Sequence, residues 1–160
     1  MWVVCFVVAG ISEQLWQLYC RSILEVQVDS DVWCTLFDPD GGVTIPGVLA
    51  AELGRAPATI VTAWNPYSQP QPYHDNVEAN LELAEVLDSY EAQTRRAIGR
   101  SKSTDYLELG LYVSNLSVVQ VADIARRFHQ HALYIVMASE ILCATSDLRS
   151  SRSVRKVVPS

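Results

Sequence analysis

Several motifs that identify common enzyme families are missing from this sequence. It has no G-x-G-x-x-G dinucleotide loop, no phosphate-binding loop and no G-x-S-x-G nucleophile motif. Its four cysteines never stand in C-x-x-C spacing; they are Cys5, Cys20, Cys34 and Cys143. This spacing argues against a zinc knuckle or a thioredoxin-like site and favours a reduced, cytoplasmic protein.

The sequence also lacks a long apolar run and an excess of basic residues. The apolar stretch 1–10 is too short to span a bilayer and has no basic residue like those that begin a secretory signal. We therefore expect residues 1–11 to be an N-terminal extension or an extra strand. The formal net charge of −6 argues against nucleic acid as the main partner. We expect neither a nucleic-acid partner nor a membrane partner.

Basic residues are scarce in the first part of the chain. Residues 1–94 hold thirteen acidic and two basic residues, whereas residues 95–160 hold ten basic and five acidic ones. Either the two parts fold together and expose ordinary solvated faces, or one side of the protein binds anions or acids.

Metal-ligand spacing is also missing. His129 and His131 could share one face of a strand, but no third ligand follows them at a suitable spacing. The sequence therefore predicts no metal site, and no cofactor is indicated.

What the sequence does contain is a set of strand and helix patterns in a chain of 160 residues, of which 49% are hydrophobic. That length supports one domain with a substantial core. We predict a single α+β domain over residues 12–145, with a mixed β-sheet of about five or six strands packed with three or four helices. Residues 146–160 are rich in serine and arginine and are expected to form a flexible basic tail.

The stretch 58–65 organises the chain. It is a continuous apolar, β-branched run that ends at Asn65-Pro66, which is typical of a strand buried on both faces. The loop after it carries Tyr67 and Tyr73, which either cover a pocket or belong to a plain surface connection.

The helix predicted over residues 75–91 is amphipathic. Asn76 and Asn80 share its apolar stripe with Leu83 and Leu87, so both amides point inward near Asn65. They either satisfy backbone groups of the loop or line a site. The opposite face is acidic, with Asp75, Glu78, Glu82 and Glu85.

A strand predicted over residues 105–113 alternates leucines with polar residues and tyrosines. This pattern favours a solvent-facing Glu108, unless the side that carries Tyr106 and Tyr112 turns toward the end of strand 58–65.

Five sequence elements resemble, in order, a bacterial family of small uncharacterised proteins, domain of unknown function 3293. They are Leu15-x-x-x-Tyr19, Ile60-Val61-Thr62-Ala63-Trp64-Asn65-Pro66, Asn76-x-x-x-Asn80-x-x-Leu83, Tyr106-x-Glu108 and Arg127-Phe128-x-Gln130-x-Ala132. The resemblance covers about residues 12–145 and implies special roles for Thr62, Asn65, Pro66, Asn76, Glu108 and Gln130. The chain departs from the family pattern at Leu109-Gly110 and at His131. The family implies a site but no activity.

Three functions are consistent with these patterns. The first is a binding or regulatory module that holds a polar or anionic small molecule with Thr62, Asn65, Asn76, Asn80 and Gln130. The second is a small enzyme, a hydrolase or transferase, in which Glu108 is an acid or base and Asn65 and Asn76 orient the substrate. The third is a protein-interaction domain that uses the acidic face of helix 75–91. An inward Glu108 with a perturbed pKa favours the enzyme, and a closed polar network without a cavity favours the interaction domain.

Overall fold

The computed structural model describes residues 11–155, which form four α-helices, one short 3-10 helix and nine strands. The helices are α1 (Glu13–Cys20), α2 (Gly47–Leu53), α3 (Tyr73–Ser89) and α4 (Val118–Arg127), with the 3-10 turn at Pro66–Ser68. The strands are β1 (Ile23–Asp29), β2 (Val32–Asp38), β3 (Gly42–Val43), β4 (Ala58–Val61), β5 (Gln93–Arg100), β6 (Leu107–Ser114), β7 (Ala132–Val136), β8 (Ile141–Thr145) and β9 (Ser151–Ser153).

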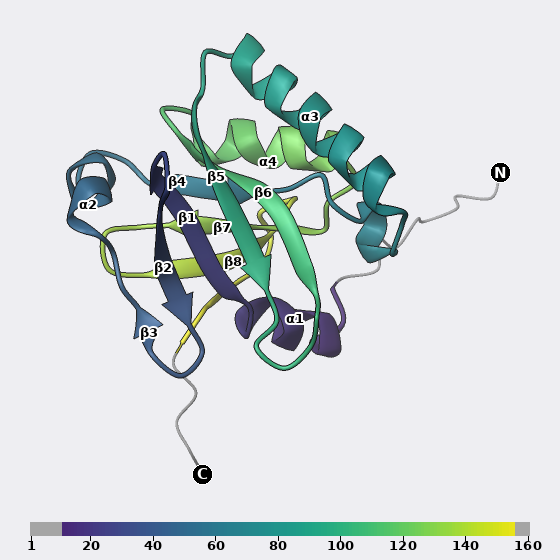
Figure 1. Cartoon of the computed structure of the whole chain (residues 1–160), viewed down its shortest axis with the longest axis horizontal. Helices are drawn as coiled ribbons and strands as arrows, with labels where there is room; N and C mark the ends of the chain where they lie inside the picture. The colour runs from purple at the N-terminus through teal and green to yellow at the C-terminus, as the bar shows by residue number, and fades with distance from the viewer. Residues whose placement is uncertain (1–10, 156–160) are drawn as a thin grey trace, which may run out of the picture.

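The nine strands form one curled sheet, a half-barrel, in the order β3-β2-β1-β5-β6-β4-β7-β8-β9 (Figure 1). Every pairing between them is antiparallel. The α+β class is confirmed, but the sheet is antiparallel rather than mixed and has more strands than the five or six predicted. The helix after β4 does not return the chain to a neighbouring parallel strand, because β5 pairs with β1 and β6. The strands β3 and β9 are too short to show an alternating pattern in the sequence.

Two apolar clusters fill the two sides of the sheet. On one side α3 and α4 lie along the sheet (Figure 1), and they bury a cluster that includes Val61, Leu83, Leu87, Val113 and Ile124. On the concave side, α1 and α2 close over a second cluster that includes Trp16, Leu36, Phe37, Leu49 and Tyr112. The strand β4 contributes to both clusters, and all four of its residues are buried, as its sequence predicts.

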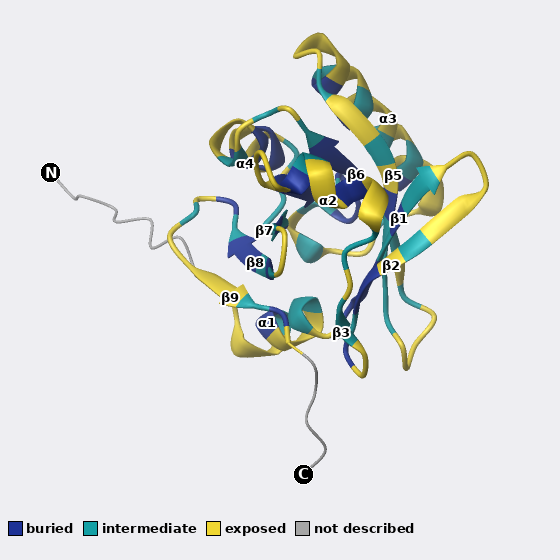
Figure 2. Cartoon of the chain, turned by 90° about the vertical axis from the view of Figure 1, so that its left-hand side faces the viewer, coloured by how far each residue is buried: buried dark blue, intermediate teal, exposed yellow. Residues whose placement is uncertain are grey.

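The amphipathic pattern of α3 is confirmed. Leu83 and Leu87 are fully buried, while the outer face of the helix is exposed (Figure 2). The acidic residues on that exposed face are Asp75, Glu78, Glu82 and Glu85.

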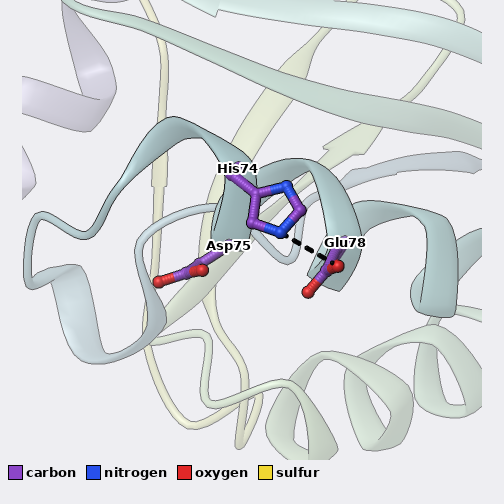
Figure 3. A group of neighbouring side chains, drawn as sticks. All are labelled: His74, Asp75 and Glu78. Atoms are coloured by element: carbon purple, nitrogen blue, oxygen red, sulfur yellow. Dashed lines mark ion pairs between the residues drawn. The ribbon is translucent and has the colours of Figure 1, made fainter.

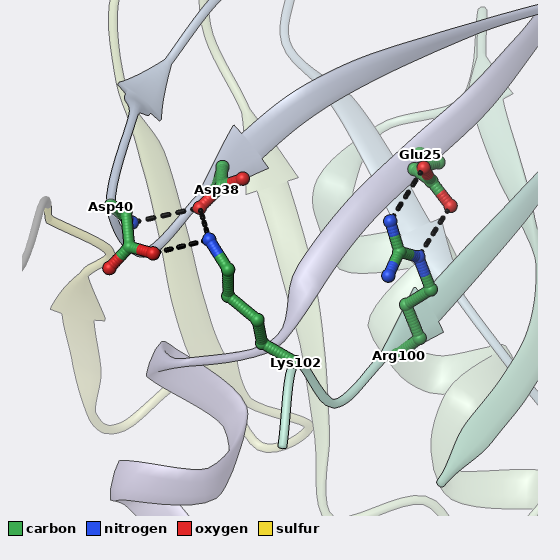
Figure 4. A network of polar contacts seen from close by, with 5 residues as sticks. All are labelled: Glu25, Asp38, Asp40, Arg100 and Lys102. Carbon is green, nitrogen blue, oxygen red and sulfur yellow. Dashed lines mark hydrogen bonds and ion pairs between the residues drawn. The ribbon is translucent and has the colours of Figure 1, made fainter. Parts of the chain in front are cut away.

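The acidic and basic parts of the chain meet in ion pairs. The Arg100 guanidinium forms a bidentate ion pair with the Glu25 carboxylate, and the Lys102 ammonium pairs with both Asp38 and Asp40 (Figure 4). Two further pairs join the same parts of the sequence: Arg95–Glu52 and Arg152–Glu13. The uneven distribution of charge along the chain is therefore partly explained by pairing between the two parts in the fold.

The chain beyond residue 145 continues the sheet. Arg152 of β9 lies opposite Cys143 of β8, and Val154 after it is 2% exposed. The expected flexible tail is therefore wrong for residues 151–154. The sequence of β9 shows no alternation of apolar and polar residues, and Val154, directly after it, makes the apolar contact with the core.

The extension or extra strand expected over residues 1–11 lies almost entirely outside the described residues, as do residues 156–160. Among residues 11–155, none of the helices has the length and apolar character needed to cross a membrane.

Candidate functional site

The segment that follows β4 is held by side chains rather than by strand pairing. Thr62 Oγ1 donates to the Leu109 carbonyl at 2.5 Å and accepts from the Trp64 amide at 3.0 Å. Asn65 then adopts left-handed backbone angles with φ of 47°, which asparagine tolerates better than most residues. The strand therefore ends at Val61, four residues earlier than predicted, because the chain turns before Pro66 is reached.

Asn65 and Asn76 form a reciprocal amide clasp. The Asn65 backbone amide donates to Asn76 Oδ1 at 2.7 Å, and Asn76 Nδ2 donates to Asn65 Oδ1 at 2.8 Å. Gln71 Nε2 donates to the same Asn76 oxygen at 2.7 Å. Both asparagines are buried, so these bonds satisfy groups that water cannot reach. The clasp attaches the loop to the first turn of α3.

Asn80 and Gln130 also bind backbone groups of this segment. Asn80 Oδ1 accepts from the Ala63 amide at 3.0 Å, and Gln130 Nε2 donates to the Trp64 carbonyl at 3.1 Å. Thr62, Asn76, Asn80 and Gln130 thus fix the backbone that carries Asn65.

The polar network adjoins a cavity on the concave side of the sheet. The cavity is narrow: its volume open to water-sized molecules is about 40 Å³, and the figure rises to about 540 Å³ only when the open mouth is included. Leu24, Ile60 and Leu133 are among its apolar walls. Its polar and aromatic walls are Tyr19, Thr62, Asn65, Ser68, Glu108, Gln130 and Tyr134. Four of the six residues named from the sequence therefore line the cavity, whereas Asn76 and Asn80 do not.

Glu108 faces the concave side, opposite to the side favoured by its sequence pattern. The side of β6 that carries Tyr106 and Tyr112 turns inward, and Tyr112 is completely buried, whereas Leu107 on the other side is 41% exposed. The leucine pattern was misleading because both sides of β6 are covered in its second half, where Val113 packs under the helices.

The Glu108 carboxyl lies in an environment that disfavours its charge. Burial raises its pKa from an ordinary 4.5 to about 6, while a hydrogen bond from the Tyr106 hydroxyl opposes the rise. The Asn65 side chain also acts on that hydroxyl, because it lowers the pKa of Tyr106. Tyr106 therefore lies between Glu108 and the end of β4. Burial, followed by the Glu108 charge, raises the pKa of Tyr106 as well.

The comparison with protein families places these residues in one matched segment. The family model described as "Protein of unknown function (DUF3293)" matches residues 61–133. The DUF3293 resemblance is confirmed over residues 61–133, a shorter segment than the 12–145 indicated by the sequence elements. No curated protein and no solved structure matches the chain.

All six residues named from the sequence lie inside the DUF3293 segment, but the cavity also needs residues outside it. Tyr19 comes from α1 and Tyr134 from β7. The Tyr19 hydroxyl bonds Ser68 Oγ at 2.9 Å, and the Tyr134 hydroxyl donates to the Tyr19 carbonyl at 2.8 Å. Burial raises the pKa of Tyr19 to about 12, so the phenol stays neutral.

Sequence reasoning missed four residues of the site: Tyr19, Ser68, Tyr106 and Tyr134. Tyr19 and Tyr106 belong to the DUF3293-like elements, so that resemblance could have identified them. Ser68 and Tyr134 carry no comparable signal, because only the curl of the sheet brings them to the cavity.

One departure from the DUF3293 pattern has a structural reason. A Cβ atom added to Gly110 would lie 2.7 Å from the Val61 carbonyl oxygen, closer than real side chains approach backbone. In this chain, glycine at position 110 lets β6 pass close to the end of β4 beside the cavity.

The loop tyrosines do not cover the cavity as a lid. Tyr67 is 55% exposed and stacks on His129 with ring centroids 4.6 Å apart, and Tyr73 is 68% exposed and packs edge-on against Trp64. Ser68 is the loop residue that reaches the cavity wall beyond Asn65. Tyr67 and Ser68 have left-handed backbone angles, with φ of 56° and 57°, so strain is concentrated next to the site.

A cluster of metal-binding residue types occurs elsewhere, on the first turns of α3. His74 Nε2 lies 3.1 Å from Glu78 Oε1, and Asp75 is beside them (Figure 3). All three side chains are exposed, and groups of this kind are common on acidic helices without a metal. The cluster lines neither the cavity nor the amide clasp.

Proposed function

We propose that the concave cavity binds a small polar molecule through Glu108, and that this molecule carries a positively charged nitrogen. The proposal rests on one observation: a half-buried carboxyl group, with its pKa raised by burial, lies in a cavity without a basic partner. Within residues 11–155, the cavity wall contains no Lys, Arg or His, and no ion pair includes Glu108.

A cationic ligand would compensate for the missing partner. A buried carboxylate is unfavourable unless a counter-charge or several hydrogen bonds accompany it. An ammonium or guanidinium group beside Glu108 would supply that counter-charge, and Tyr19 and Tyr134, which line the same cavity, belong to the aromatic residues that attract cations.

The charge of the proposed ligand differs from the anionic charge that we considered from the sequence. The sequence indicated a polar or anionic molecule because a helix start lies near the end of β4. That helix start is occupied by the Asn65–Asn76 clasp, and among residues 11–155 the only ionisable acid in the cavity wall besides the tyrosines is Glu108. These contacts support a polar cation rather than an anion.

Acid–base catalysis is a second candidate for the same cavity. The pKa of Glu108 near 6 is suited to a group that takes up and releases a proton near neutral pH. Asn65 and Tyr106 would then orient the reacting molecule. A closed polar network without a cavity would have favoured the protein-interaction function. The network here adjoins a cavity, so it adds no support for an interaction through α3.

A thermal-shift screen tests the proposal. Small ammonium and guanidinium compounds are compared with carboxylates of matched size at pH 7.5. Saturation at 100 times the dissociation constant adds about 2.7 kcal/mol of stability, which raises the melting temperature by roughly 5–10 °C in a domain of this size.

The variant Glu108→Gln should remove the shift given by the cations, and Glu82→Gln, on the exposed face of α3, should keep it. Stabilisation by the carboxylates alone, or a cation effect that persists in Glu108→Gln, would overturn the proposal. A compound that binds is then incubated with the wild type and analysed by mass spectrometry. Conversion that disappears in Glu108→Gln would favour the catalytic candidate.

A further inference from the structure

We propose that Cys20 and Cys143 form a redox site, a dithiol that converts to a disulfide by exchange with small-molecule disulfides. Cys20 is the last residue of α1, and Cys143 lies in the middle of β8. The site is separate from Glu108 and does not depend on the function proposed for the cavity.

Two observations place these cysteines together. Cys20 packs against the apolar cluster that contains Cys143, and the side chain of Cys143 has the largest effect on the pKa of the Cys20 thiol. In addition, Tyr134 is the cross-strand partner of Cys143, and its hydroxyl donates to the carbonyl of Tyr19, the residue before Cys20. The end of α1 is therefore fixed against the β7–β8 ladder at the position of Cys143.

The two thiols differ in access. Cys143 is completely buried, whereas Cys20 is half-buried and thus open to a reagent from solvent. The order of reaction follows from this difference: Cys20 reacts first with the external disulfide, and Cys143 resolves the product.

Arg152 provides a positive charge at this position. It lies opposite Cys143 in the β8–β9 pair, its guanidinium stacks 4.9 Å from the Trp16 ring centre, and it binds Glu13. The hydrogen bond from Cys143 and the charge of Arg152 lower the pKa of Cys20 to about 7, against the effect of burial. A substantial fraction of Cys20 is therefore thiolate at neutral pH.

Cys143 has the opposite tendency. Its bond to Cys20, followed by burial, raises the pKa of the Cys143 thiol, and a negative charge on Cys20 adds to that rise. Once Cys20 has entered a mixed disulfide, that charge is gone and Cys143 ionises more readily.

The reaction is a two-step exchange. The Cys20 thiolate attacks one sulfur of the external disulfide, forms an S–S bond to it and expels one thiolate. That thiolate or solvent takes the proton of Cys143, whose sulfur then attacks Cys20 Sγ and expels the second thiolate, which is protonated. The two cysteines lose two electrons, and the external disulfide is reduced to two thiols.

The test uses the full chain, reduced and then incubated with oxidised glutathione. Unreacted thiols are blocked with iodoacetamide, and the protein is digested with trypsin and a glutamate-specific protease. The sequence places each cysteine in its own peptide: Cys5 in 1–13, Cys20 in 14–21, Cys34 in 26–52 and Cys143 in 141–149.

The expected product is peptide 14–21 linked to peptide 141–149, and dithiothreitol should reverse the link. In Cys143→Ser, Cys20 should instead retain glutathione as a mixed disulfide. The matched control Cys34→Ser, in which a half-buried thiol of β2 is removed, should leave the link unchanged. Three results would overturn the proposal: a stable mixed disulfide at Cys20 in the wild type, a link from Cys20 to Cys5 or Cys34, or unreacted Cys20 and Cys143.

Discussion

The stability of this protein should fall as Glu108 ionises, and Glu108→Gln should remove that fall. Burial makes the folded protein hold the Glu108 proton more tightly than the unfolded chain does, because the pKa rises from 4.5 to about 6. The contribution of Glu108 to the free energy of unfolding is therefore greatest below pH 4.5 and is lost as the pH rises through 6.

The size of the effect follows from the pKa difference. A rise from 4.5 to about 6 corresponds to about 2 kcal/mol of stability lost between acidic and neutral pH. Glutamine has nearly the same shape, keeps an oxygen that accepts from Tyr106 and carries no charge. The stability of Glu108→Gln relative to the wild type should therefore increase by about 2 kcal/mol between pH 3 and pH 7.5.

Urea unfolding followed by tryptophan fluorescence measures this change, since Trp16 and Trp64 are buried and become exposed on unfolding. With a typical dependence of roughly 2 kcal/mol per molar urea, the midpoints should diverge by about 1 M between the two pH values. Other carboxyl groups titrate in both proteins and cancel in the comparison, and Glu82→Gln controls for the lost charge. A constant difference across this pH range, or a wild type that gains stability relative to Glu108→Gln as the pH rises, would refute the reasoning.

Two further predictions concern the surroundings of the site. Asn76→Ala leaves the buried amide of Asn65 without its acceptor, so urea unfolding should show a loss of roughly 1–3 kcal/mol; a change of a few tenths would mean that the clasp is dispensable. Deleting residues 149–160 removes β9 and the buried Val154, and the loss of the Val154 contact alone should reduce stability by about 1.5–3 kcal/mol. Deleting only residues 156–160 is the control, and equal melting temperatures for both truncated proteins would contradict the role given to β9.

Local patterns predicted the helices well, because each helix carries its own signals. Ser117 with Gln120 forms the capping box that begins α4, and the stripe of Leu83 and Leu87 determines the buried side of α3. These elements depend on residues close together in the chain.

The arrangement of the sheet could not be obtained in this way. Whether Glu108 faces water or a cavity depends on the curl that brings α1 and β7 over the inner side of β6. The alternation in β6 separates its residues onto two sides of the sheet. It does not show which side faces the cavity, because Tyr112 on one side and Val113 on the other are both buried. The contact of Cys20 with Cys143 likewise joins residues far apart in the sequence.

The sequence places the amides near the end of β4 and leaves two roles open for Asn76 and Asn80, of which the contacts in the structure match the loop-holding one. Asn76 and Asn80 bind the backbone of the loop, and Asn65 alone among the three reaches the cavity. A sequence cannot distinguish an amide that holds a loop from one that contacts a ligand, since both are inward-facing and polar.

The central claim is that Glu108 is the counter-charge for a cation in the concave cavity. Calorimetry at pH 6 tests it directly, with the strongest-binding ammonium or guanidinium compound and two buffers of different ionisation enthalpy. About half of the Glu108 side chains carry a proton at this pH, so cation binding should release about half a proton per molecule in the wild type and none in Glu108→Gln. Binding to the wild type with no proton release would contradict the account.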